Sequence, residues 1–174
     1  MKEMIRYGFI LGLICVLAAG LLAGVNALTR EAIANQAQAE EQSALKEVMP
    51  QAAKFIPVGQ PPEVAYYKVF NSQEQLIGYV FKASGKGYSS VIQTLAGMNL
   101  QGVISAVKII SQNETPGLGM RITENKFTGQ FKNQDSLNLP DVQAITGATI
   151  SSRAVMNSVI KKAQEIKELV KNEK

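Results

Sequence analysis

The feature that most constrains this chain is a long uncharged stretch near its N-terminus. From Tyr7 to Leu28, 22 consecutive residues carry no charged side chain, and eleven of them are Phe, Ile, Leu or Val. A helix of that length rises about 33 Å, which matches the hydrocarbon core of a bilayer at roughly 30 Å. The sequence therefore predicts a transmembrane helix over residues 7–28.

The charges beside this stretch indicate an orientation. Lys2 and Arg6 precede it, whereas Arg30 on its other side is followed at once by a glutamate. Because basic residues accumulate on the cytoplasmic side, we expect residues 1–6 in the cytoplasm and the rest of the chain outside. The competing interpretation is a cleaved signal peptide, since residues 25–27 loosely resemble a cleavage site. A signal peptide usually has only about 7–15 apolar residues, so we expect a retained, single-pass anchor in the inner cell membrane.

The composition removes most enzyme classes. The chain has no His, no Trp and a single Cys, so zinc sites, haem attachment, iron–sulfur clusters and Cys–His or Ser–His pairs lack their ligands or base. We expect no catalytic residue and no metal site, and redox chemistry would need an organic cofactor. The 18 Lys and Arg outnumber the 14 Asp and Glu without forming a basic stripe, which argues against nucleic acid binding.

The residues after the membrane helix divide into a stalk and one compact domain. Residues 29–50 are rich in Ala, Glu and Gln, contain no Gly and end at Pro50, a pattern that favours a helix. We interpret this helix as a stalk that continues the membrane helix. Residues 51–174 then form the extracytoplasmic domain.

Two strand pairs are predicted in the first part of the domain. Val, Tyr and Phe residues over 63–81 surround a polar connection at 71–75, which indicates a hairpin. Residues 91–98 and 103–110 have the same character around a turn at 99–102. Both patterns are typical of antiparallel strands.

Helices are predicted in the second part of the domain. We expect a short helix over 122–131, a short strand over 142–145 and then a long C-terminal helix. In the long helix, apolar residues repeat every three or four positions, at Val155, Val159, Ala163, Ile166 and Val170. The predicted fold class is α+β, with a small antiparallel sheet and flanking helices.

The sharpest motif lies at residues 146–151, TGATIS, directly before the C-terminal helix. Free backbone N–H groups and the positive end of the helix dipole favour a phosphate there, and Gly147 and Ala148 allow a close approach to the backbone. The alternative is an ordinary helix cap, for which Ser and Thr are the usual residues. The spacing of the residues leaves both interpretations open.

This hexapeptide resembles the flavinylation motif of the FMN-binding domains in the G subunits of Rnf electron-transport complexes and the C subunits of sodium-pumping NADH:quinone reductases. Residues 114–119, ETPGLG, resemble a second hallmark of these domains, and residues 85–88, GKGY, resemble a third. Together with the N-terminal anchor, the resemblance covers essentially the whole chain.

The resemblance implies a covalent cofactor and a set of residues around it. FMN would be attached through its phosphate, as a phosphoester, to Thr149. The other implied cofactor-binding residues are Thr146, Gly147, Ala148, Ser151, Glu114, Thr115, Gly117, Leu118 and Gly119. For Tyr88 we expect a place in the core rather than beside the cofactor.

The resemblance also implies a function and partners. The chain would relay electrons as the G subunit of an Rnf-type ferredoxin:NAD⁺ oxidoreductase that moves Na⁺ or H⁺, together with the A, B, C, D and E subunits. No His is present to activate the Thr149 hydroxyl, so an exported flavin transferase of the ApbE type, with FAD as donor, is implied. The alternatives are the C subunit of the quinone reductase, a lone anchored flavoprotein, and a non-redox binding module in which Thr149 only caps the helix.

Overall fold

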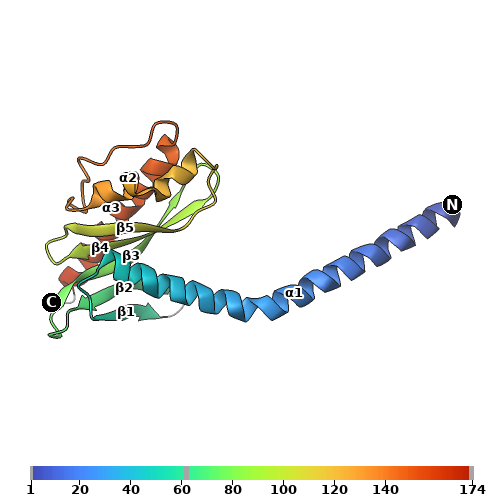
Figure 1. The fold of residues 1–174 in the computed structure, drawn as a ribbon, viewed down its shortest axis with the longest axis horizontal. Helices are drawn as coiled ribbons and strands as arrows, with labels where there is room; N and C mark the ends of the chain where they lie inside the picture. Colours follow the sequence, from blue (N-terminus) through green and yellow to red (C-terminus); the bar gives the residue numbers. More distant parts are fainter. Residues whose placement is uncertain (1, 61–62, 173–174) are drawn as a thin grey trace. The chain divides into compact units, whose positions relative to one another are not determined.

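The computed structural model describes residues 2–60 and 63–172, which form two compact units (Figure 1). The first unit ends at Glu41 and the second begins at Gln42. A single helix, α1 (Lys2–Val48), supplies all the described residues of the first unit and the first residues of the second. The second unit therefore starts nine residues before position 51, where the sequence suggested that the domain begins.

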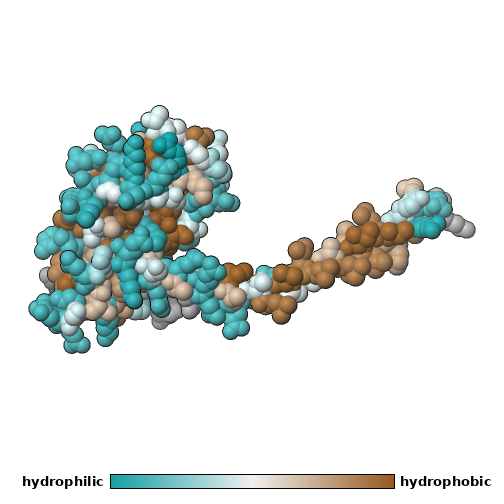
Figure 2. All heavy atoms as spheres, in the orientation of Figure 1, coloured by the Kyte–Doolittle hydropathy of each residue, from teal (hydrophilic) through white to brown (hydrophobic). Residues whose placement is uncertain are grey.

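The N-terminal part of α1 is an exposed apolar rod. Phe9, Leu17 and Leu21 are 74%, 60% and 73% exposed, and Figure 2 shows hydrophobic residues along this part of the helix. The helix is long and apolar enough to cross a membrane. Helices were predicted over 7–28 and 29–50, and the structure confirms helix as far as Val48, in one continuous element.

The second unit is built on a five-stranded antiparallel sheet whose strands follow one another in chain order. The strands are β1 (Lys54–Gln60), β2 (Glu63–Phe70), β3 (Leu76–Lys86), β4 (Val91–Asn99) and β5 (Ile104–Ser111). Both predicted hairpins are confirmed, as β2–β3 and β4–β5. An asparagine organises each connection: Asn71 Oδ1 accepts the N–H groups of Gln73 and Gln75, and Asn99 Oδ1 accepts those of Gln101 and Val103.

Strand β1 was not predicted from the sequence. It contains Pro57, which has no N–H to donate, and Gly59, where the register with β2 shifts. Both residues weaken a strand pattern, and proline is tolerated in sheets mainly on edge strands. β1 pairs only with β2 and is therefore an edge strand.

Helices cover both faces of the sheet. α3 (Thr149–Asn172) packs on β3 and β4, where Phe81, Ile92 and Met98 are completely or almost completely buried. The end of α1 packs on the other face, with Leu45 and Val48 in its core. Strand residues alternate between the faces, so each strand supplies both cores.

The approach of α1 to the sheet is close. Ser105 Oγ donates a hydrogen bond of 2.7 Å to the Val48 carbonyl. A Cβ at Gly97 would lie 2.8 Å from the same carbonyl oxygen. Only glycine therefore fits at position 97 without a shift of α1.

The segment between β5 and α3 differs from the prediction. A single helix was expected over 122–131, but the structure has three short pieces: η1 (Gly119–Thr123), α2 (Asn125–Thr128) and η2 (Gly129–Phe131). The strand expected over 142–145 is wrong. The N–H groups of Val142, Gln143 and Ile145 donate to Leu139 O, Gln130 Oε1 and Ser152 Oγ, so this segment pairs with turn and side-chain acceptors instead of a strand.

If the end of α1 belongs to the domain core, Leu45→Ala will lower the free energy of unfolding by about 2–5 kcal/mol, because it leaves a cavity at a buried site. Ile33→Ala, on the same helix but 61% exposed, will change it by no more than about 0.5 kcal/mol. Chemical denaturation of the full chain in detergent measures both. Equal effects would show that the last turns of α1 are not part of the core.

Candidate functional site

The three motifs meet at one cavity of about 400 Å³. Its walls come from the loop after β3, the turn before η1 and the start of α3. The lining residues are Tyr88, Glu114, Thr115, Leu118, Gly119, Gly147, Ala148, Thr149, Ile150 and Ser151. Tyr88 and Ser151, which are 63 positions apart in the chain, thus line the same site.

The Glu114 carboxylate joins these three segments. It is only 6% exposed, and it accepts backbone N–H groups from Tyr88 (3.1 Å), Ser89 (3.0 Å) and Ser90 (2.9 Å). The Ser90 hydroxyl adds a longer contact of 3.3 Å, and the Ser151 hydroxyl donates from α3 at 2.6 Å. A buried carboxylate needs such donors, because losing water without replacing its hydrogen bonds is costly.

Two glycines make room for this carboxylate. A Cβ at Gly87 would lie 2.5 Å from Glu114 Oε1, and a Cβ at Gly119 would lie 2.8 Å from Glu114 Oε2. These glycines belong to the GKGY and ETPGLG motifs. Their small size therefore serves the contact between the loops, in addition to any role beside a ligand.

The hydrogen bonds also set the charge of Glu114. Burial by itself raises the pKa of this carboxyl, but donation from Ser151 and from the N–H groups of Ser90, Ser89 and Tyr88 outweighs burial and holds the pKa below its usual value. Glu114 is therefore a carboxylate at neutral pH. Since its oxygens are occupied by protein donors, it is a poor candidate for a general base.

Thr149 is the first residue of α3 and is exposed. Within the described part of the chain, its hydroxyl makes no hydrogen bond, and the N–H groups of Thr149, Ile150 and Ser151 have no acceptor. Ser152 Oγ accepts the Ile145 N–H and donates to the Ala148 carbonyl, so it ties the preceding turn to the helix and leaves the first N–H groups of α3 uncapped. The Thr149 hydroxyl is thus available for other chemistry.

Most of the predicted site residues line this cavity, but two do not. Thr146 lines a separate cavity beside Arg121 and Gln130. Gly117, with φ +74°, has open space where a Cβ would lie, with no other atom within 4 Å, and serves the turn. The prediction that Tyr88 lies in the core is wrong: its side chain is 72% exposed on the cavity wall.

Ile150 was not predicted as a site residue, although it lines the cavity and is 56% exposed. Its place between two hydroxyl residues, where a predicted helix begins, is the sequence signal from which it could have been predicted. With Tyr88 and Leu118, it gives the cavity an apolar rim.

These features fit a phosphate-bearing aromatic group. Three unpaired N–H groups at the start of a 24-residue helix favour an anion. At Gly147, φ is +84° and the nearest atom to a Cβ would be 3.5 Å away, so the backbone stays accessible. The apolar rim suits a flat ring, and the cavity volume is within the range of small-molecule sites.

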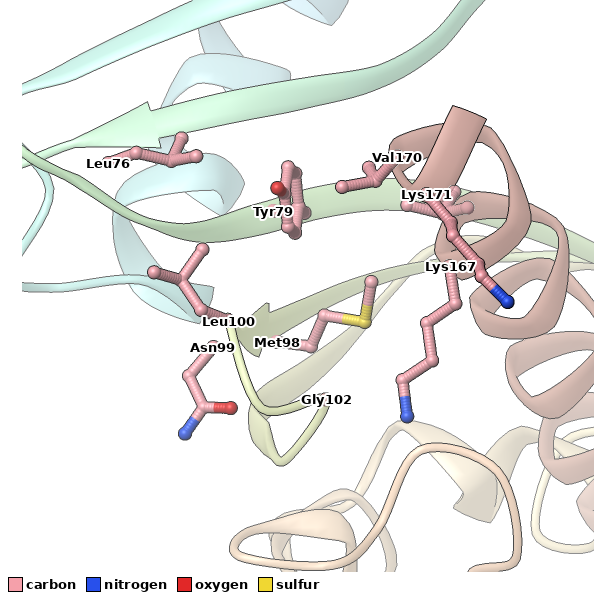
Figure 3. A pocket seen from close by; sticks show the side chains of 10 residues that line it. Leu76, Tyr79, Met98, Asn99, Leu100, Gly102, Lys167, Val170 and Lys171 are labelled. Atoms are coloured by element: carbon pink, nitrogen blue, oxygen red, sulfur yellow. The ribbon is translucent and has the colours of Figure 1, made fainter. Parts of the chain in front are cut away.

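A larger cavity of about 540 Å³ lies at the other end of β3 and α3 (Figure 3). Leu76, Tyr79 and Met98 lie at its base, and Lys167 and Lys171 come from the last turns of α3. It contains none of the predicted site residues and no helix N-terminus. We therefore assign the functional site to the smaller cavity, which has both.

The role of Glu114 can be tested with Glu114→Gln, which keeps the shape but turns an amide NH₂ toward N–H and O–H donors. We expect the free energy of unfolding at neutral pH to fall by about 1–3 kcal/mol. Because the folded pKa is lowered, the contribution of the carboxylate is fully present above the unfolded pKa of about 4.3 and is lost as the pH falls through the folded pKa. The free energies of unfolding of the wild type and the variant should therefore become similar at acidic pH.

Denaturation curves at neutral and acidic pH measure this difference. The control is Glu124→Gln, an exposed carboxylate 3.5 Å from Arg121 Nε, which should change stability by no more than about 0.5 kcal/mol. A constant difference between wild type and Glu114→Gln at all pH values would contradict the assigned role of the charge.

Comparisons with known proteins identify the family of this chain. The family model of the FMN-binding domain matches residues 87–164, and that of the RnfG N-terminal region matches residues 1–48. The chain is 36% identical over 172 residues to the G subunit of an ion-translocating oxidoreductase complex of Methanosarcina acetivorans, covering 91% of this chain and 92% of the relative. It is 31% identical over 184 residues to the G subunit of a Na⁺-translocating ferredoxin:NAD⁺ oxidoreductase complex of Acetobacterium woodii, with coverages of 91% and 89%.

A solved structure supports the fold. The crystal structure of Shewanella oneidensis NqrC superposes with a TM-score of 0.51 at 20% identity, over 65% of this chain and 66% of that chain. At that identity the likeness concerns the fold alone, and it agrees with the predicted α+β class. The extent and identity of the sequence matches confirm the resemblance inferred from the three motifs: this chain belongs to the family of G subunits of ion-translocating oxidoreductase complexes and contains the FMN-binding domain of that family.

Proposed function

We propose that this protein is the membrane-anchored electron-transfer subunit of an Rnf-type complex and carries FMN as a phosphoester on Thr149. The complex would couple electron transfer between ferredoxin and NAD⁺ to Na⁺ or H⁺ translocation, as the names of the relatives indicate. The observation that carries the proposal is the exposed Thr149 hydroxyl, which has no hydrogen bond to any described residue and lies on the wall of a cavity in an FMN-binding domain.

Different residues of the cavity would bind different parts of the cofactor. The start of α3 and Gly147 would hold the phosphate, and Leu118 and Ile150, which also line the cavity, would offer apolar contacts to the ring. The isoalloxazine supplies the electron chemistry, and the protein supplies its position and its electrostatic surroundings. Because attachment through the phosphate lies away from the ring, the tether retains the cofactor without altering the part that is reduced.

Attachment needs a second protein. Within the described residues no acceptor contacts the Thr149 hydroxyl, and Glu114, the carboxylate of the cavity, is occupied by its own donors. We infer an ApbE-type transferase that uses FAD. Thr149 Oγ forms a bond to the flavin-side phosphorus, the pyrophosphate bridge breaks, AMP leaves, and the hydroxyl proton passes to a base of the transferase.

Thr149→Ala tests the attachment. Co-expressed with the transferase, the variant should lose covalent flavin completely while its free energy of unfolding changes by no more than about 0.5 kcal/mol, since the hydroxyl makes no hydrogen bond. Thr146→Ala is the matched control, because Thr146 lies outside the cavity and should leave the modification intact. Intact-mass and peptide mass analysis look for FMN less one water. Covalent flavin in the Thr149→Ala protein would refute the assignment.

We also propose that residues 1–6 are cytoplasmic and that the FMN domain lies outside the inner cell membrane. Lys2 and Arg6 before the apolar span support this orientation. In a Cys15→Ser background, Gln73→Cys on the exposed β2–β3 turn should react with a membrane-impermeant maleimide in intact spheroplasts. Glu3→Cys should react only after lysis, and the reverse pattern would overturn the orientation.

A further inference from the structure

Tyr88 combines a fixed backbone with an exposed ring. Its N–H donates to Glu114 Oε2, the next two N–H groups donate to Glu114 Oε1, and Gly87 N–H donates 2.8 Å to the Ser90 carbonyl. The side chain is nevertheless 72% exposed. A loop held by hydrogen bonds therefore presents a large aromatic ring at the cavity, where a bound ring would find an aromatic partner.

The position of Tyr88 is distinctive within the second unit. Among the described residues of that unit, it is the one exposed aromatic side chain; the others are buried or partly buried. It also lies on the wall of the cavity, where Leu118 (51% exposed) comes from the turn before η1 and Ile150 (56% exposed) from the start of α3. Three segments thus each direct one exposed apolar side chain to the same cavity.

We propose that the phenol ring of Tyr88 contacts the isoalloxazine of the FMN carried by Thr149 and excludes water from it. This proposal rests on the proposed function. An aromatic face is the usual partner for a flat conjugated ring, and offset or edge-to-face contact is the preferred arrangement. Leu118 and Ile150 supply aliphatic contacts, and Tyr88 supplies the aromatic contact.

A phenol in contact with flavin has a spectroscopic signature. On excitation, one electron passes from the phenol to the flavin and then returns, so the emission lifetime becomes very short and no net reaction occurs. A phenyl ring is much harder to oxidise than a phenol. Tyr88→Phe therefore keeps the contact but loses the quenching, whereas Tyr88→Leu loses both.

The experiment measures time-resolved flavin emission and absorption of the full chain, loaded by co-expression with the transferase and purified in detergent. We expect the wild-type emission to be dominated by its shortest lifetime. Tyr88→Phe should lose that component and gain severalfold in steady-state intensity while its absorption bands stay in place. Tyr88→Leu should gain intensity and also shift the bands. Tyr67→Phe, at a partly buried tyrosine packed with the core on the α1 side of the sheet, should match the wild type.

The outcomes separate this inference from the proposed function. Intact mass first shows whether the flavin is attached. If it is attached and Tyr88→Phe has wild-type lifetimes, the contact does not exist and the inference is overturned, whereas attachment stands. If no flavin is attached to the wild-type chain, the proposed function fails, and the contact fails with it.

Discussion

The arrangement of the site depends on one buried carboxylate. Glu114 reaches from the turn before η1 to three consecutive backbone N–H groups in the loop after β3 and to the Ser151 hydroxyl on α3. Each of the three segments is rich in glycine or small polar residues and has little apolar surface of its own to hold it in place. The charge-assisted hydrogen bonds replace that packing and hold the three segments together around the cavity.

The sheet explains why the site is at this end of the domain. α3 packs along β3 and β4 on one face, so its N-terminus is carried to the end of β3 where the GKGY loop begins. The end of α1 covers the other face around Val69, Val80 and Leu95. With both faces covered, the ends of the strands are left for loops, and loops on a rigid scaffold are where binding residues usually lie.

Elements with a periodic apolar pattern, or with turns held by nearby residues, could be predicted from the sequence. Strand pairs around Asn71 and Asn99 were recognised because the turn residues hydrogen-bond within a few positions, and α3 was recognised by its apolar repeat. β1 was missed because Pro57 and Gly59 weaken its pattern. The strand expected over 142–145 is wrong because its N–H groups donate to turn and side-chain acceptors, of which Gln130 is 13 positions away. The prediction for Tyr88 is wrong because its loop is fixed by hydrogen bonds to Glu114, 26 positions along the chain, and the sequence around Tyr88 does not reveal them.

The hydrogen bonds at the start of α3 bear on how the protein matures. Ser152 ties the preceding turn to the first turn of the helix, and neither of its two hydrogen bonds involves Thr149. A polypeptide that needed its prosthetic group in order to fold would have to be modified during biogenesis. Here protein groups hold the turn beside Thr149, so the proposed transferase would act on a folded domain.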